Sequence, residues 1–262
     1  AGIVSVIAQR DIDLSPGVIS FTAQPSTTGE GAALNLAANN LTVTSGSFIS
    51  GGTLGLASGG NIDIDVRDTV VLGSATSSAF PAIITTSTQG AGQGGDIRVA
   101  ARRVDVIAGA QLQSVTFAEG RGGNLRIDAQ QVNVSGAAIT PIGTQFLSGI
   151  SASSGLSNLP FQPTGKGGNV NINASALRVD EGAQIAVDSF GTGNSGNLSI
   201  RSESVHLDQG SQLSTAAAFG DGGNITIDDA HTLLLRRGSL ISTRAGVGDG
   251  GNIIIDADFV VT

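Results

Sequence analysis

The heptapeptide Gly222-Gly223-Asn224-Ile225-Thr226-Ile227-Asp228 recurs in closely related forms along this chain. Residues 167–173 and 250–256 repeat it almost unchanged, and weaker copies begin at 59, 94, 122 and 195. The second glycines, at 60, 95, 123, 168, 196, 223 and 251, lie 35, 28, 45, 28, 27 and 28 residues apart. A fixed period between about 20 and 50 residues indicates a repeat architecture. We therefore expect one continuous body built from units of about 28 residues.

The repeat at 195–221 shows what each unit contains. Apolar and polar residues alternate in three short runs, at 198–200, 205–207 and 211–215, and turn-forming residues separate the runs. Such alternation predicts short β-strands. We expect three strands and three turns in each coil, with turns at 201–204, at 208–210 and at the Gly-Gly corner.

The same alternation assigns inward-facing residues to every coil. The first-strand pairs are Leu34/Leu36, Ile62/Ile64, Ile97/Val99, Leu125/Ile127, Val170/Ile172, Leu198/Ile200, Ile225/Ile227 and Ile253/Ile255. The second-strand pairs include Leu41/Val43, Val104/Val106, Val132/Val134, Leu177/Val179, Val205/Leu207 and Leu233/Leu235. The third strand contributes Ile49, Leu112, Ile139, Ile185, Leu213 and Leu240. Residues 3–21 follow the pattern weakly, which makes eight coils and a stub.

A single coil cannot bury its inward face, so the coils must stack. Equivalent strands then pair in parallel and in register at about 4.8 Å per rung, which gives a rod of roughly 40 Å. The links are too short for the helical crossovers of ordinary parallel sheets. The sequence therefore predicts an all-β fold, a right-handed parallel β-helix in a single domain spanning 1–262.

The Gly-Gly corner carries further expectations. Glycine is expected there because a sharp corner often needs a positive φ. The residue that follows should stack from coil to coil and bond to neighbouring backbone or to its equivalents. These residues are Asn61, Asp96, Asn124, Asn169, Asn197, Asn224 and Asn252. Phe117, Phe190 and Phe219 precede the corner and are candidates for a second stack.

Two coils are longer than the rest. The extra residues lie at about 74–93 and at about 141–166, in both cases after the second strand. The two insertion loops start two coils apart, so they could meet on one flank. Insertions often mark the binding face of a solenoid, and the alternative is neutral variation of the surface.

The composition excludes several classes of function. The net charge is −8 and the pI is about 4.5, which argues against nucleic acid or an anionic membrane as partner. The chain has no Cys, so disulfides and thiolate metal sites are ruled out. It contains no apolar run long enough to span a bilayer. It also has no Met and stops within a repeat, from which we expect a piece of a longer protein.

The repeat resembles that of a known family. Residues 222–227, followed by a Leu-x-Leu run, Gly238-Ser239 and Ile241-Ser242-Thr243, resemble the repeat region of filamentous-haemagglutinin-like exoproteins, the large cyanobacterial ones above all. The resemblance covers nearly the whole chain. It implies a right-handed β-helix, export by a two-partner outer-membrane transporter, and a secreted protein at or beyond the bacterial cell surface.

Members of this family are adhesins, matrix or filament proteins, and carriers of contact-dependent toxins. Neither the amino-terminal secretion domain of the family nor a toxin tip is recognisable in residues 1–262. The resemblance therefore implies that this part of the protein is shaft.

Three columns of outward residues were the candidates for chemistry. Glycosidase catalysis needs two carboxylates about 5–9 Å apart. In the second column below, the most acidic one, Asp228 and Asp256 are the first two neighbouring rungs that both carry a carboxylate. We therefore predict no catalytic residue and no enzyme. The columns read Asp63, Arg98, Arg126, Asn171, Ser199, Thr226, Ile254; then Asp65, Ala100, Asp128, Asn173, Arg201, Asp228, Asp256; then Asp105, Asn133, Arg178, His206, Leu234.

No metal or cofactor residue is predicted either. Residues 246–251 are superficially similar to a calcium β-roll, but that motif recurs every nine residues or so, and calcium takes about six to eight oxygens. His231 is expected in a turn without a set of metal ligands. The Asn-x-Ser/Thr sequons are either glycosylation sites or a by-product of Asn corners beside Ser/Thr-rich strands. They lie at Asn40, Asn133, Asn173, Asn197 and Asn224.

Three hypotheses of function follow. The first is a non-enzymatic, exported β-helix shaft of an adhesin or of an extracellular filament or matrix. The second is a module that binds glycans or cells through the insertion loops, and the third is a β-helical polysaccharide lyase or hydrolase. The export transporter is the expected partner. Self-association into fibres and binding of cell-surface glycans stay open, and neither nucleic acid nor membrane insertion is expected.

Overall fold

The computed structural model describes residues 2–73, 80–156 and 162–262. Every regular element among these residues is a β-strand, and none of them is helical. The strands are β1 (Ile3–Ile7), β2 (Asp11–Leu14), β3 (Val18–Ala23), β4 (Ala33–Val43), β5 (Phe48–Thr53), β6 (Ile62–Leu72), β7 (Ile83–Thr88), β8 (Ile97–Ile107), β9 (Gln111–Thr116), β10 (Leu125–Ser135), β11 (Ala137–Ile139), β12 (Gln145–Leu147), β13 (Gly149–Ser154), β14 (Val170–Asp180), β15 (Gln184–Ala186), β16 (Leu198–Leu207), β17 (Gln212–Ala217), β18 (Ile225–Leu235), β19 (Leu240–Ala245) and β20 (Ile253–Val261).

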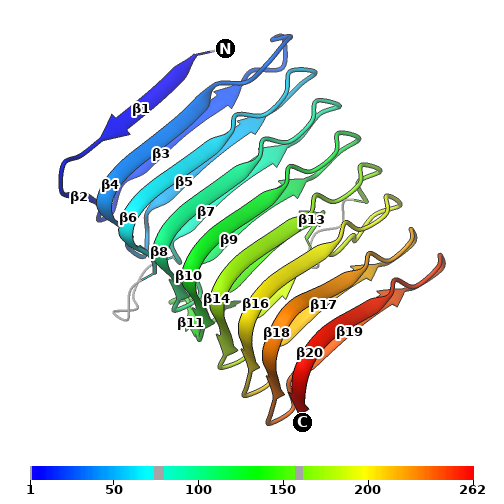
Figure 1. Ribbon diagram of the computed structural model, residues 1–262. Helices are drawn as coiled ribbons and strands as arrows, with labels where there is room; N and C mark the ends of the chain where they lie inside the picture. The colour runs from blue at the N-terminus through cyan, green and yellow to red at the C-terminus, as the bar shows by residue number, and fades with distance from the viewer. Residues whose placement is uncertain (1, 74–79, 157–161) are drawn as a thin grey trace.

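Two parallel sheets run the length of the molecule, with the termini at opposite ends (Figure 1). The long-strand sheet has the order β1-β4-β6-β8-β10-β14-β16-β18-β20, and β2 also pairs with β4. The short-strand sheet has the order β3-β5-β7-β9-β13-β15-β17-β19. Neighbours in each sheet come from successive copies of the repeat. The prediction of an all-β fold with long parallel sheets is confirmed, and the arrangement is compatible with a β-helix or another solenoid.

The aliphatic core lies between the two sheets. Leu198 pairs with Ile225, and Ile225 pairs with Ile253. Leu198 and Ile225 are fully buried, whereas Ile253 belongs to the last rung and is partly exposed. The inward pairs predicted for residues 34–233 are buried in the same way along both halves of the long strands. Columns of aliphatic side chains thus form one continuous hydrophobic core.

A regular repeat, such as the one with β16 and β17, contains two strands where we expected three; the repeat that begins at 122 has the β11–β12 hairpin in addition. The turn expected at 201–204 is absent, because β16 runs without interruption from Leu198 to Leu207. The long strands curve instead (Figure 1). A small inward residue lies at the middle of the strand, for example Ala174 or Ser202, and both are buried. The chain can therefore bend around the core there, and the ladder is irregular at the bend, since the register between β16 and β18 shifts between Arg201 and Ser204.

Two inward assignments on the short strands are wrong. Ile139 is 65% exposed because it lies in the antiparallel hairpin β11–β12. The core position belongs to Ile150, which pairs with Leu112 and is fully buried. Leu240 is likewise on the outside, and Ile241 is the residue that pairs with Leu213.

The turn between the long and the short strand is the one predicted at 208–210. The amide of Ser211 donates to the carbonyl of Asp208 at 3.3 Å, and both intervening residues, Gln209 and Gly210, have positive φ values. Two left-handed central residues define a type I′ turn. The equivalent turns at 107–110, 180–183 and 236–239 have the same hydrogen bond and the same φ signs.

The reason given above for the Gly-Gly corner is wrong. None of its glycines has a positive φ. Space is the constraint, since successive coils touch there through their backbones. A Cβ on Gly223 would lie 1.7 Å from the carbonyl oxygen of Gly196, and one on Gly251 would lie 1.9 Å from that of Gly223.

The polar stack at this corner is confirmed. The side-chain Oδ1 of Asn197 accepts a hydrogen bond from the amide of Asn224 at 2.9 Å, and Asn224 does the same for Asn252 at 2.8 Å. The ladder continues back through Asn169, Asn124, Asp96 and Asn61. Each side-chain oxygen thus satisfies a backbone donor of the next coil.

The phenylalanine stack does not form. The amide of Gly155 bonds to Thr116, and the amide of Phe190 bonds to Ser154. Gly155 therefore occupies the rung between Phe117 and Phe190. Phe219 is displaced by one residue, because Ala218 has the matching position. Among the described residues the one close ring pair is His231–Phe259.

Parts of both expected insertion loops belong to the regular ladders. Within 74–93, strand β7 pairs with β5 and β9, and residues 74–79 lie outside the described part of the chain. Within 141–166, β12 pairs with β11, and β13 joins the short-strand sheet. Residues 157–161 lie outside the described ranges. A meeting of the two loops on one flank stays a prediction.

Candidate functional site

The predicted outward columns are in register on the long-strand sheet. Arg126 pairs with Asn171, and Asp128 pairs with Asn173. Together with Arg201 and Asp228 they line a shallow hollow of about 190 Å³. Arg126 donates two hydrogen bonds of 2.8 Å to Asp128, and this contact lowers the pKa of that carboxyl. A carboxylate held in this way is a poor general acid.

The two histidines are not joined in one site. His206 pairs with Arg178 in the ladder, as the column predicted, but the guanidinium of Arg178 bonds to Asp180. His231 lies within β18, so the expectation that it lies in a turn is wrong. Its Nδ1 is 2.8 Å from Asp258 in the next coil, and both side chains are exposed.

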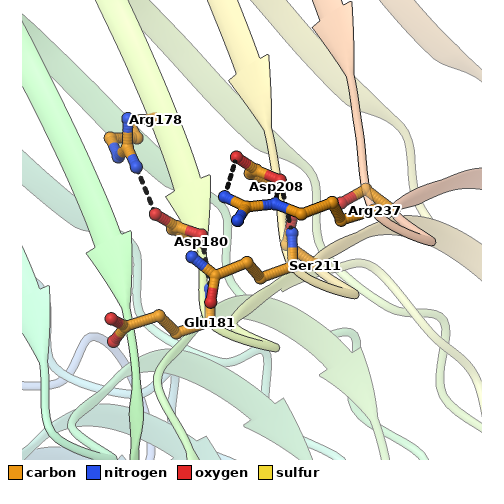
Figure 2. A network of polar contacts seen from close by, with 8 residues as sticks. Arg178, Asp180, Glu181, Asp208, Ser211 and Arg237 are labelled. Carbon is orange, nitrogen blue, oxygen red and sulfur yellow. Dashed lines mark hydrogen bonds and ion pairs between the residues drawn. The ribbon is translucent and has the colours of Figure 1, made fainter. Parts of the chain in front are cut away.

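A carboxylate pair that the sequence columns missed lies where the long strands end. Asp180 and Asp208 occupy adjacent rungs, since the amide of Asp208 bonds to the carbonyl of Val179. Figure 2 shows their two arginine partners, Arg178 on Asp180 and Arg237 on Asp208. Arg237 comes from the following coil and donates bonds of 2.7 and 2.6 Å to the two oxygens of Asp208. The carboxylates are 7% and 12% exposed.

The geometry of the turn at 236–239 explains the Asp208–Arg237 ion pair. The positive φ of Arg237 projects its side chain back over the preceding turn. The amides of Glu181 and Gln209 also donate to Asp180 and Asp208, each at 2.8–2.9 Å. Asp208 therefore joins two successive turns, whereas both partners of Asp180 belong to its own coil. A spacing of 28 residues, with a glycine two positions after each Asp, was the available sequence signal.

The Asp208–Arg237 pair predicts a pH-dependent stability. The bond from Arg237, with help from the Gln209 amide, lowers the pKa of Asp208 from 3.8 to about 2. A carboxyl with a depressed folded-state pKa stabilises the fold above its unfolded pKa, and that contribution is lost as the pH falls through the folded pKa. Wild type should therefore lose stability relative to Asp208→Asn between about pH 4 and pH 2.

Urea unfolding at each pH, followed by circular dichroism, measures this difference. The gap between the two midpoints should be widest above pH 4 and close as the pH approaches 2. Arg237→Gln should remove the same pH-dependent part, and the double variant should lose no more than either single variant. A gap that does not change with pH would contradict the assignment.

The short-strand sheet carries a second candidate site, a trough along β13 of about 290 Å³. Three small residues form its floor; Gly149 lies in register between Gln111 of β9 and Gln184 of β15, and Ser151 lies between Gln113 and Ala186. The floor is Gly149, Ser151 and Ser153, and the walls are Gln111, Gln113 and Gln184. We refer to this site as the β13 trough. No sequence column included it.

Asp188 lines one end of the β13 trough, beside Leu156 and Phe190. Its Oδ1 accepts hydrogen bonds from the amide of Ala216 at 2.9 Å and from the hydroxyl of Ser214 at 3.0 Å. Burial raises the pKa of this carboxyl, and the two bonds offset only part of that effect. The Asp188 side chain, just after the end of β15, thus bonds to a backbone amide of β17 in the next coil.

The remaining observations concern metal binding, membrane spanning and the sequons. Across residues 2–73, 80–156 and 162–262 no three His, Cys, Asp or Glu side chains gather in a way that could hold a metal. In the same ranges there is no helix able to cross a bilayer. In three of the five sequons the side-chain amide group of the Asn forms hydrogen bonds to a neighbouring coil. These are Asn40 with Asp11 and Thr69, Asn197 with Asn224, and Asn224 with Asn252.

Comparisons of this chain with protein-family models, with curated proteins and with solved structures find no match. The proposals below therefore depend on the fold, the ladders and the geometry of the side chains.

Proposed function

We propose that this chain is the shaft of a large exported surface protein, an adhesin or a filament-forming matrix protein of the filamentous-haemagglutinin type. In this proposal it is a right-handed parallel β-helix of about eight coils of roughly 28 residues, with insertions near 74–93 and 141–166. It is not an enzyme. Its expected place is outside the cell or on the bacterial surface, reached through a two-partner outer-membrane transporter.

The single observation that carries the proposal is the unbroken parallel pairing in both sheets, from β1 to β20 and from β3 to β19. Successive coils are held together by backbone ladders in both sheets and by side-chain contacts between them. Aliphatic columns lie inside, the Asn ladder lies at one corner, and ion pairs such as Asp208–Arg237 lie at another. A stack built in this way can be extended without changing its cross-section, as a shaft requires.

The polar surface supports the same proposal. Two of its carboxylates are neutralised by arginines, Asp128 by Arg126 and Asp208 by Arg237. Such pairs tie residues of one strand or of neighbouring coils together, and a carboxylate held by an arginine is a poor general acid. They fit a structural role better than the lyase or hydrolase alternative.

The location can be tested on cells of the source organism. Antibodies raised against residues 1–262 should label intact cells or the culture medium, seen by immunogold electron microscopy and by blotting. Deletion of a two-partner transporter gene in the same neighbourhood should leave the antigen inside the cell. A cytoplasmic protein serves as the control for lysis. Label that needs permeabilised cells would refute an exported shaft.

A further inference from the structure

The β13 trough is formed by a difference in side-chain size between rungs. Gly149 lies between Gln111 and Gln184, and Ser151 lies between Gln113 and Ala186. At Gly149 a low residue therefore lies between two taller ones, and because rungs are about 4.8 Å apart this leaves a channel about 10 Å wide there. The channel therefore follows the direction of β13 across the outer face of the sheet.

One wall of the trough is held in place before any ligand arrives. The Nε2 of Gln111 donates to the carbonyl oxygen of Gly109 at 3.3 Å and also to that of Leu147 in the β11–β12 hairpin. The amide oxygen of Gln111 lies over Gly149, where an added Cβ would be 3.1 Å away. A fixed side-chain amide loses little entropy when it binds a ligand.

The far end of the trough combines a polar and an apolar group. Asp188 bonds to the sheet through Oδ1, and the structure gives its Oδ2 no partner among the described residues. Phe190 and Leu156 lie beside it. A carboxyl that is partly removed from water gains from a hydrogen-bond donor brought by a ligand.

The chemistry of the lining selects the class of ligand. The trough lies on a sheet face, where backbone groups are already paired within the ladders, so a peptide could not add to it as a strand. Amides, hydroxyls, one carboxyl and two apolar side chains suit a molecule that carries many hydroxyl groups on a flat apolar ring. Among the described residues no Lys or Arg lines the trough, and the chain carries a net charge of −8, which disfavours uronates and sulfated sugars.

The geometry points to a binding site for a neutral oligosaccharide in the β13 trough, with Gln111, Gln184 and Asp188 as hydrogen-bond partners and Phe190 against a sugar ring. This site adds a ligand to the proposed shaft and does not depend on the export route. The occupant lies along β13, in contact with side chains of three successive coils.

Titration calorimetry with neutral hexasaccharides tests the site, with cellohexaose, maltohexaose and mannohexaose as probes and an oligogalacturonate for comparison. At least one neutral probe should bind to the wild-type chain. Ser151→Gln places in the trough the same side chain that Gln113 carries on the neighbouring rung, and it should weaken binding by at least about tenfold. Ser175→Gln is the matched control, since Ser175 is an exposed serine of β14 on the long-strand sheet, and it should leave the affinity unchanged.

Asp188→Asn tests the roles of the two carboxyl oxygens separately. The variant keeps an acceptor for the Ala216 amide, so the fold should persist while an amide group takes the place of Oδ2 at the trough. Binding should fall, with the circular dichroism spectrum unchanged. Absence of binding to all three neutral probes, binding to the oligogalacturonate alone, or an equal affinity of Ser151→Gln and wild type would overturn the inference. None of these results bears on surface labelling of cells.

Discussion

Gly223→Ala should destabilise the chain by more than about 4 kcal/mol, the range reserved for severe local conflict. A Cβ on Gly223 would lie 1.7 Å from the carbonyl oxygen of Gly196. The obstacle is backbone, which cannot rotate aside as a side chain can. The two coils would have to separate at the corner, and the hydrogen bond from Asn224 to Asn197 would lengthen with them.

The matched control is Gly250→Ala. Gly250 belongs to the same motif one repeat later, its φ is not positive, and a Cβ there meets nothing within 4 Å. The two variants remove the same backbone freedom, so their difference isolates the contact between coils. Circular dichroism during urea unfolding is the suitable measurement, because the chain has no Trp or Tyr. Equal midpoints for the two variants would show that close stacking does not require glycine at position 223.

Ile225→Ala should cost about 2–5 kcal/mol, as deletions of large buried aliphatic side chains do. Ile225 is fully buried and lies between Leu198 and Ile253 in the column. Leu198 is held between the ladders of two neighbouring coils, so it cannot collapse into the space that the missing atoms leave. Ile253 lies on the last rung and is partly exposed, so the loss should fall in the middle of that range.

Thr226→Ala is the control for this second substitution. Thr226 is the next residue of the same strand, it points outward, and its rung neighbours are Ser199 and Ile254. Its replacement should change stability by less than about 1 kcal/mol, through strand propensity alone. An Ile225→Ala variant as stable as Thr226→Ala would mean that the aliphatic column is not what holds the coils together.

Much of the core could be predicted because it repeats. Leu198, Ile225 and Ile253 occur at matched places in successive copies, and in-register stacking then brings them together without any further information. The Asn ladder was predictable for the same reason. Prediction failed where one copy departs from the pattern. Ile139 was assigned to the core because it fits the alternation, whereas the β11–β12 hairpin removes it from the ladder and leaves that place to Ile150.

The physical role of a residue was harder to predict than its position. The Gly-Gly corner was placed correctly, but its glycines are required by the approach of two backbones and not by a left-handed φ. The candidate sites were harder still. Asp208 and Arg237 are 29 residues apart, and Asp188 bonds to Ala216, 28 residues away. Nothing local marks either pair as partners.

The sequence by itself determined the period, the parallel strands, the inward aliphatic residues and the polar stack, because these follow from one local pattern written several times. Only the tertiary structure decided which charges meet and where the surface is hollow. Those outcomes depend on which side chains of different coils share a rung, and the loop lengths between coils set that alignment. The β13 trough exists because Gly149 is aligned between Gln111 and Gln184, and because Ser151 lies beside Gln113 on the same face.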